Sequence, residues 1–371
     1  MLYYIIFSVL TLIALLEMVT VPERIKKAIY ITMCIIFVMI SGLRWNTGND
    51  WKPYYSFFTR FTADDPVFLL RMEPGYVQFV KFLRIFSASF TFYLMALAII
   101  TVSIKTIFFY RYAGAVFLAL VLYWGTFLGD VMAVRQSIAI SLCVLATHFI
   151  ITRRAWYFII CTIVAAQVHV TAYIFLLAYP IYYANWSVRY KYVFLVISII
   201  FGSFSISENI LELLTRLVPA GVGLDRVNQK ALAYLEIGNE IGSTAELSKM
   251  QRLVAALAKR AVMLPIFFYF QERFTISKDK YKGFLNLYTF GNVVFFFVVD
   301  FLTLQRAATY FYTFEILMLC IIYINVKSKS VWFIIIITYA LFKMISIILG
   351  AYGLLVPYIW IFSENTYRYV Y

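Results

Sequence analysis

The chain has 371 residues, of which 64% are hydrophobic and 13% are charged, and its mean hydropathy is +0.86. Soluble domains carry about 25% charged residues, so this composition excludes an ordinary soluble protein and predicts an all-α, polytopic membrane protein. The net charge of +14 requires no nucleic-acid partner, because basic loops at the inner membrane face, together with a few outer arginines, account for it.

A membrane span needs about 20 apolar residues, and this length identifies the hydrophobic segments along the chain. They lie at 2–20, 28–43, 91–109, 114–128, 132–151, 156–183, 192–206, 254–271, 284–301, 306–325 and 331–349. The segment 156–183 is too long for one ordinary helix and carries Gln167 and His169 near its middle, so we predict a broken or re-entrant helix there. We expect about 11–12 membrane segments in a single integral membrane domain over residues 1–371.

Clusters of lysine and arginine in short loops indicate which side of the membrane each loop occupies, because such clusters stay in the cytoplasm. They occur at 22–27, 153–154, 189–191, 273–282 and 327–329. With these clusters inside, two longer stretches lie outside: an outer loop at 44–90 with an amphipathic helix, and an outer helical cap loop at 207–253. This topology is consistent with the basic clusters on both sides of segment 156–183 only if that segment enters and leaves on the cytoplasmic face. This favours the re-entrant form.

Two short outer loops each contain one acid followed by one arginine, Asp130 with Arg135 and Asp300 with Arg306. Placing a charged side chain at the end of a membrane span costs a few kcal/mol of free energy unless the charge is paired, hydrated or binds a ligand. Two interpretations stay open. Each pair is a local ion pair that fixes helix ends, or Arg135 and Arg306 face a shared cavity and hold an anionic group. Arginine suits phosphate and diphosphate because its planar fork donates two parallel hydrogen bonds.

Three side chains are candidates for proton transfer: His169, Asp50 and Glu73. An imidazole can accept or donate a proton near neutral pH, although a lone histidine in an apolar segment is more often a core residue. Carboxylates are the usual partners of sugar hydroxyls. The aromatic residues around Asp50 have two explanations, stacking on a sugar ring or an interfacial belt at the level of the lipid headgroups.

The expected substrate-binding side chains come from several segments of the chain. They are Arg44, Tyr54, Tyr76, Arg135, Gln136, Arg226, Arg306 and Tyr310. Arg306 and Tyr310 are four residues apart, which places them on one face of an α-helix. The four cysteines have no metal-binding spacing and the chain has no phosphate-binding loop or dinucleotide fingerprint, so we expect no metal site and no cofactor.

Five motifs occur in order along the chain: RWNTGNDWKPYYSFF, EPGYVQFVKFL, DVMAVRQSIAISL, QVHVTAYIFLLAYPI and LQRAATYF. Together they resemble the EpsG family of Wzy-like bacterial polysaccharide polymerases, over roughly residues 40–315. The resemblance implies a helical scaffold of the GT-C type in the bacterial cytoplasmic membrane, with its active site facing the periplasm or exterior. The positions that match the family pattern are Arg44, Asp50, Tyr54, Glu73, Arg135, His169 and Arg306.

The residues and the resemblance together indicate a glycosyltransferase that joins polyprenyl-diphosphate-linked oligosaccharide repeat units, undecaprenyl diphosphate being the carrier, without nucleotide or metal. His169, Asp50 or Glu73 would act as base, a single displacement would invert the anomeric carbon, and the arginines would stabilise the departing diphosphate. The expected partners are the lipid-linked donor and acceptor, membrane lipids and a chain-length regulator protein, with no nucleic acid.

Two alternative functions stay open. A lipid-linked oligosaccharide flippase or polysaccharide exporter would need charged residues along a path through the membrane, and we find only Lys343 and Glu315 well inside the predicted spans. A membrane acyltransferase that modifies glycans could use a lone histidine. It would take its acyl donor from the cytoplasmic side, whereas the candidate residues are predicted to lie outside.

Overall fold

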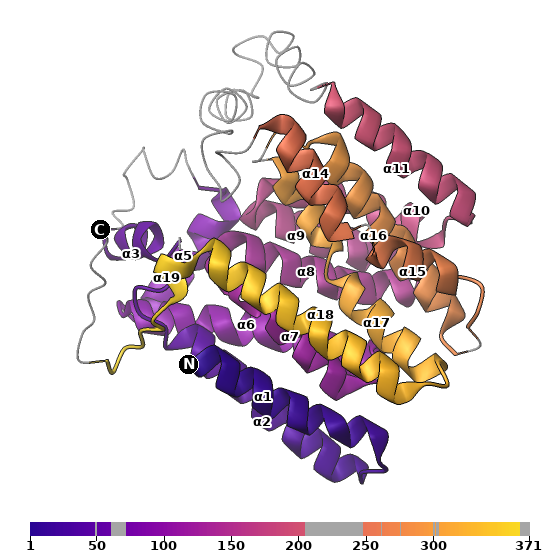
Figure 1. The fold of residues 1–371 in the computed structure, drawn as a ribbon. Coiled ribbons are helices and arrows are strands. Elements are labelled where there is room, and N and C mark those ends of the chain that lie inside the picture. The colour runs from indigo at the N-terminus through magenta and orange to yellow at the C-terminus, as the bar shows by residue number, and fades with distance from the viewer. Residues whose placement is uncertain are drawn as a thin grey trace, which may run out of the picture. The chain divides into compact units, whose positions relative to one another are not determined.

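The computed structural model describes residues 1–48, 50–60, 72–204, 248–260, 262–274, 276–299, 301 and 304–363. Within these ranges the regular structure is helical, apart from one isolated bridge between Arg44 and Trp360 (Figure 1). This confirms the predicted all-α class. Arg226, Asp300 and most of the predicted cap at 207–253 lie outside the described residues.

The chain groups into two compact units, and each is described by itself. The first unit comprises Met1–Tyr173 and Leu319–Tyr371, and the second comprises Ile174–Met318. Whether the whole chain acts as the single membrane domain expected from its sequence stays a prediction.

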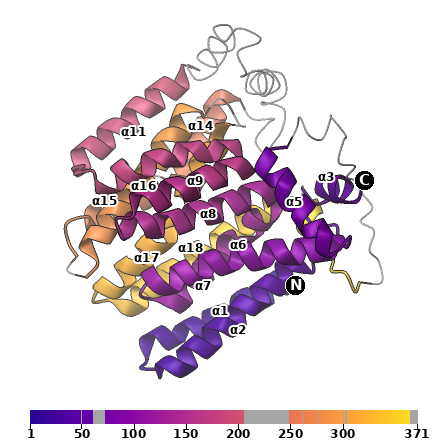
Figure 2. The ribbon, with the colours of Figure 1, turned by 180° about the vertical axis from the view of Figure 1, so that it is seen from behind.

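Helices packed against one another build the first unit. They are α1 (Leu2–Ala14), α2 (Glu23–Gly42), α3 (Trp51–Thr59), α5 (Pro74–Phe86), α6 (Phe90–Tyr112), α7 (Val116–Met132), α8 (Val134–Ile151), α9 (Ala155–Val168), α18 (Lys329–Gly350) and α19 (Tyr352–Leu355), with the 3-10 helix η1 (Leu15–Met18) after α1. Helix α8 packs along α9 and α6, α2 packs along α6, and α7 packs along α18 (Figure 2). The last pair touches through the backbone, since a Cβ atom on Gly125 would lie 2.7 Å from the carbonyl oxygen of Ala340.

The second unit contains shorter helices around α16 (Lys278–Phe297). They are the end of η2 (Val170–Leu177), α10 (Ala178–Tyr183), α11 (Val188–Ser203), α14 (Lys249–Arg260), α15 (Met263–Phe270), η3 (Leu304–Phe311) and the start of α17 (Phe314–Asn325), which continues into the first unit. Helices α10, α11 and η3 all pack against α16. At Gly202 a Cβ atom would lie 2.0 Å from the carbonyl oxygen of Phe296, so only glycine permits this approach of α11 to α16.

Several of these helices are long and apolar enough to cross a membrane. Among the described residues, five pass this test on length and composition: Glu23–Gly42, Phe90–Tyr112, Val134–Ile151, Leu304–Asn325 and Lys329–Gly350. The pair α14 and α15, bent by 41°, could form a sixth span. The chain is therefore a multi-pass membrane protein. Three further predicted segments, 2–20, 114–128 and 156–183, form apolar helices of 10–17 residues, and the last of them is broken into two such helices.

The predicted break inside segment 156–183 is present. Helix α9 ends at Val168, His169 is extended with φ −150° and ψ 112°, and the chain continues as the 3-10 helix η2. Whether this segment enters and leaves on one membrane face stays a prediction.

Helix α5 buries one face and exposes the other. Its buried residues Tyr76, Val77, Val80 and Leu83 recur at helical spacing and join a cluster with aromatic residues of α3 and α6. On its opposite face Phe82, Ile85 and Phe86 are 56%, 79% and 65% exposed. The sequence EPGY begins this helix with Pro74 at its first position, where a missing N–H costs nothing. Helices α3 and α5 thus cover one end of α6 and α8.

Candidate functional site

Arg135, the second residue of α8, lies at the centre of a polar cluster in the first unit. Its Nη1 donates to Glu73 Oε2 at 2.5 Å, and its Nε donates to the hydroxyl of Tyr54 at 2.5 Å. Its guanidinium carbon also lies 5.8 Å and 5.9 Å from the ring centres of Tyr54 and Tyr76. Four predicted residues, from three separate segments of the sequence, therefore meet here. The Arg135 side chain remains 21% exposed, so part of it is accessible from outside the protein.

Glu73 connects this cluster to the break in the helix at His169. It precedes the first residue of α5 in extended conformation, and while its Oε2 pairs with Arg135, its Oε1 accepts a hydrogen bond from the backbone N–H of Val170 at 3.5 Å. One carboxylate thus contacts both α8 and the residue that follows His169.

A glycine brings α5 close enough to α9 for this connection. A Cβ atom on Gly75 would lie 2.6 Å from Cβ of Gln167 and 2.8 Å from its carbonyl oxygen. Contacts this short do not occur between real Cβ atoms and backbone. The absence of a side chain at residue 75 therefore sets the distance between Glu73 and the end of α9.

His169 lies buried at the end of α9, only 6% exposed. Its Nδ1 lies 2.7 Å from Oγ1 of Thr171, and its backbone N–H donates to the carbonyl of Ala165. Thr171 therefore holds one ring nitrogen, and the hydroxyl sets the ring orientation. An imidazole fixed in this way can accept or donate a proton near neutral pH, although the same contacts suit a structural histidine.

Tyrosine hydroxyls extend the cluster into the core. The hydroxyls of Tyr76 and Tyr93 are hydrogen-bonded to each other, and both side chains are fully buried. Burial raises the pKa of Tyr54 to about 12, while the positive charge of Arg135 acts in the opposite direction. Burial likewise raises the pKa of Tyr76. These phenols therefore stay neutral at physiological pH and act as hydrogen-bonding groups.

Arg44 and Asp50 lie near this cluster in the loop after α2. Arg44 is 4% exposed and sits in the short bridge with Trp360, while Asp50 precedes α3. Burial lowers the pKa of Arg44 to about 10, and the negative charge of Asp50 partly counters this effect. Arg44 lines the same small cavity as Val134, the residue before Arg135, so the two arginines lie in the same region of the first unit.

The remaining predicted residues are placed differently. Gln136 is buried on α8 at 9% exposure. Arg306 and Tyr310 belong to the second unit, and their predicted common face is wrong: Arg306 is exposed and Tyr310 is fully buried. The reason is that residues 304–311 form a 3-10 helix with three residues per turn, which separates positions four apart. That Arg135 and Arg306 share a cavity stays a prediction.

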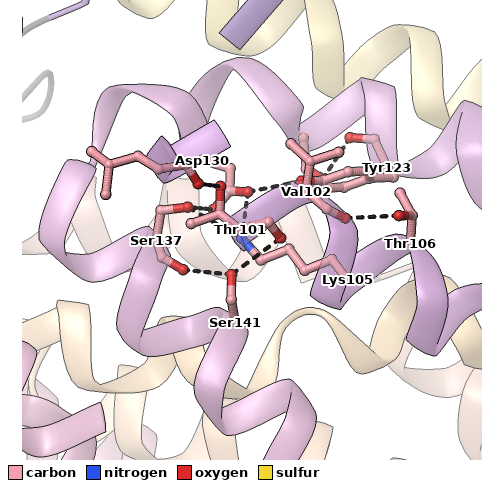
Figure 3. A network of polar contacts seen from close by, with 10 residues as sticks. Thr101, Val102, Lys105, Thr106, Tyr123, Asp130, Ser137 and Ser141 are labelled. Carbon is pink, nitrogen blue, oxygen red and sulfur yellow. Dashed lines mark hydrogen bonds and ion pairs between the residues drawn. The ribbon is translucent and has the colours of Figure 1, made fainter. Parts of the chain in front are cut away.

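The interpretation of Asp130 and Arg135 as a local ion pair is wrong. The Asp130 carboxylate forms an ion pair with Lys105 of α6 and accepts hydrogen bonds from Ser137 at 2.8 Å and Tyr123 at 3.1 Å (Figure 3). Lys105 is 2% exposed and lies inside the span Phe90–Tyr112, so the expectation that only Lys343 and Glu315 lie inside spans is also wrong. The signal was present in the sequence, since a lysine in a span requires a partner.

Arg260, in the second unit, is a partly buried arginine that was not among the predicted site residues. Arg260 donates from Nε to Asn292 at 2.6 Å and from Nη2 to the Tyr312 hydroxyl at 3.0 Å. Its guanidinium stacks 3.9 Å from the ring centre of Phe295. Nearby, the Tyr288 hydroxyl donates to Glu315. Because Arg260 follows Lys259 at the end of a helix, its sequence context is that of an ordinary surface cation.

Among the described residues, no three His, Cys, Asp or Glu side chains gather as a metal site would require. A family model described as the EpsG family matches residues 27–360, a range that includes all the candidate residues. Neither the curated proteins nor the solved structures gave a significant match.

Proposed function

The chain belongs to the EpsG family, a family of Wzy-like polysaccharide polymerases, and from this premise we propose that it joins polyprenyl-diphosphate-linked repeat units on the outer face of the cytoplasmic membrane. The observation that supports this most is the cluster around Glu73, whose carboxylate contacts Arg135 and the backbone beside His169. Glu73 thus contacts both Arg135, the cation proposed for the diphosphate, and the backbone next to His169, the proposed proton acceptor. A GT-C-type scaffold is part of the same proposal.

Arg135 binds the diphosphate of the donor in this proposal. A guanidinium keeps its charge at all physiological pH values and donates to phosphate oxygens in parallel. The pairing with Glu73 and Tyr54 fixes its orientation before substrate arrives, and preorganised donors of this kind commonly contribute about 3 kcal/mol each to the transition state. Arg44 and Arg306 are the further cations assigned to the diphosphate.

His169 is the base that we favour. Both carboxylate oxygens of Glu73 already have partners, which suits a positioning role better than proton transfer. The imidazole takes the proton of the acceptor hydroxyl as its oxygen forms a bond to the anomeric carbon of the donor. The bond from that carbon to the diphosphate breaks, and its electron pair leaves with the diphosphate. One displacement inverts the carbon, and no nucleotide is consumed because the leaving group is part of the donor.

The test is polymerisation by the purified protein in liposomes, supplied only with a synthetic polyprenyl-diphosphate-linked repeat unit. We expect a ladder of longer glycans on a gel and one polyprenyl diphosphate released for each linkage. The variants Arg135→Ala, Arg306→Ala and His169→Ala should make no ladder. Arg273→Ala is the matched control, because Arg273 is an exposed arginine stacked on Tyr269 and is outside the proposed site.

A folded wild-type protein that makes no ladder from this substrate would refute the proposed function. Transport of the substrate without new linkages would indicate a flippase or exporter. Modification that requires an added acyl donor would indicate an acyltransferase. Normal chain lengths from both the Arg135→Ala and Arg306→Ala proteins would remove the arginines from the mechanism.

A further inference from the structure

Asp130 is an acid in an unfavourable place for a protein that binds a diphosphate. It lies in the last turn of α7, five residues before Arg135, and Ala133 separates α7 from α8. It also lines, with Arg44 and Ser137, a cavity of about 20 Å³, which is room for about one water molecule. An uncompensated carboxylate between the segments that carry Arg44 and Arg135 would attract both cations and repel an anionic substrate.

Lys105, on the neighbouring helix α6, forms an ion pair with this carboxylate. Its Nζ pairs with Oδ2 of Asp130 and lies 3.3 Å from Oγ of Ser137, which in turn donates to Oδ1 of Asp130 (Figure 3). The side chains of Lys105 and Asp130 are 2% and 14% exposed. The two opposite charges cancel locally because they are in contact, and salt in the solvent screens the attraction of such a buried pair only weakly.

The pairing pattern shows the consequence of this arrangement. Asp130 is the acid nearest to Arg135 in the sequence, yet Arg135 pairs with Glu73, 62 positions away. The Asp130 carboxylate instead has Lys105, Ser137 and Tyr123 as partners.

We propose that Lys105 is a positioning residue that neutralises and holds Asp130, so that Arg135 pairs with Glu73 and the Asp130 carboxylate neither draws Arg44 and Arg135 away from the diphosphate nor repels it. This inference rests on the proposed function, because it concerns the anionic group of the same substrate. It adds a role for α6, a helix without a predicted site residue.

The experiment measures two quantities on the same variants: the Kd for a sugar-free polyprenyl diphosphate and the rate of ladder formation. For Lys105→Met and Lys105→Gln we expect a Kd at least about tenfold higher, because the charge of Asp130 is released. The double variant Lys105→Met/Asp130→Asn should return the Kd to within about twofold of wild type, since neutral replacement of a buried ion pair is often tolerated. Asp130→Asn alone should bind the probe at least as tightly as wild type.

Lys191→Met is the matched control. Lys191 is fully buried and donates to the carbonyl of Trp186 at 2.8 Å and to Gln271 at 2.6 Å, but it belongs to the second unit and has no part in the proposed site. Its loss should lower the melting temperature and leave the Kd of the folded protein unchanged. A purely structural role for Lys105 predicts the same behaviour for Lys105→Met, and that result would overturn the inference.

Each remaining outcome is decisive. If neither single lysine variant folds, the Asp130→Asn and double variants decide: weaker probe binding than wild type in either one overturns the inference, and binding as tight as wild type in both supports it. If the wild type binds the probe but makes no ladder, the proposed polymerase function fails while the effect of Lys105 on anion binding is still measured.

Discussion

Glu73 and Arg135 are 62 positions apart in the sequence, and their carboxylate and guanidinium groups lie 2.5 Å apart between α5 and α8. With side chains 8% and 21% exposed, the pair is largely removed from water. It joins a short helix of the 44–90 segment to a membrane-spanning helix, so it links the stability of the fold to the geometry of the proposed site.

The coupling between these two residues is measurable as a double-mutant cycle. From Glu73→Gln, Arg135→Gln and the double variant we expect a coupling free energy of about 1–3 kcal/mol. The reason is that the two charges of a partly buried ion pair interact more strongly than those of an exposed pair. Thermal unfolding in detergent provides the measurement. The control is the exposed pair Glu272 and Lys278, 3.2 Å apart, for which we expect at most about 0.5 kcal/mol. Equal coupling in the two pairs would contradict the prediction.

Gly75→Ala should separate α5 from α9. The new methyl group would lie 2.6 Å from Cβ of Gln167, so the helices must move apart, at a cost of about 1–3 kcal/mol. We also expect slower polymerisation, because Glu73 would lose its contact with Val170. Gly350→Ala is the matched control, since no atom lies within 4 Å of the added carbon. The comparison fails if both variants melt at the wild-type temperature.

Tyr54 should make stability depend on pH in the alkaline range. Its pKa is about 12 in the folded protein and 10.0 for an ordinary tyrosine, so the folded state holds the phenolic proton more tightly. The resulting stability is complete below pH 10 and is lost as the pH rises to 12, a change of up to about 2 kcal/mol. Melting temperatures between pH 9 and 12 should fall more steeply for wild type than for Tyr54→Phe. Parallel curves would argue against a buried phenol.

Arg260→Lys should destabilise the second unit. Lysine cannot donate in two directions to Asn292 and Tyr312 while stacking on Phe295, so we expect a loss of about 2 kcal/mol. Chemical denaturation or scanning fluorimetry of the detergent-solubilised protein would measure it. Arg273→Lys, at an exposed arginine stacked 4.0 Å from the ring centre of Tyr269, should change stability by less than about 0.5 kcal/mol. Similar losses in both proteins would show that the buried hydrogen bonds of Arg260 contribute little.

Local features of the sequence predicted much of the fold. Apolar runs indicated the helices, and the polar residues Gln167 and His169 inside one run indicated the break at the end of α9. These features depend on neighbouring residues alone. They need no knowledge of which helices touch.

The partners of the charged residues depend on tertiary packing and were harder to predict. Proximity in sequence suggested Asp130 for Arg135, but α6 brings Lys105 to Asp130 and α5 brings Glu73 to Arg135. Arg306 and Tyr310 were misplaced for a different reason. An α-helical period was assumed where the chain forms a 3-10 helix, and the hydrophobic pattern of eight residues does not distinguish the two.

The outward face of α5 has a mechanical consequence. In a bilayer the exposed apolar side chains of Phe82, Ile85 and Phe86 favour the lipid boundary, and Glu73 lies at the opposite end of the same helix. In the proposed polymerase, lipid contact at this face would set the depth at which the Glu73 carboxylate meets Arg135, and the bilayer surface would help to align the site.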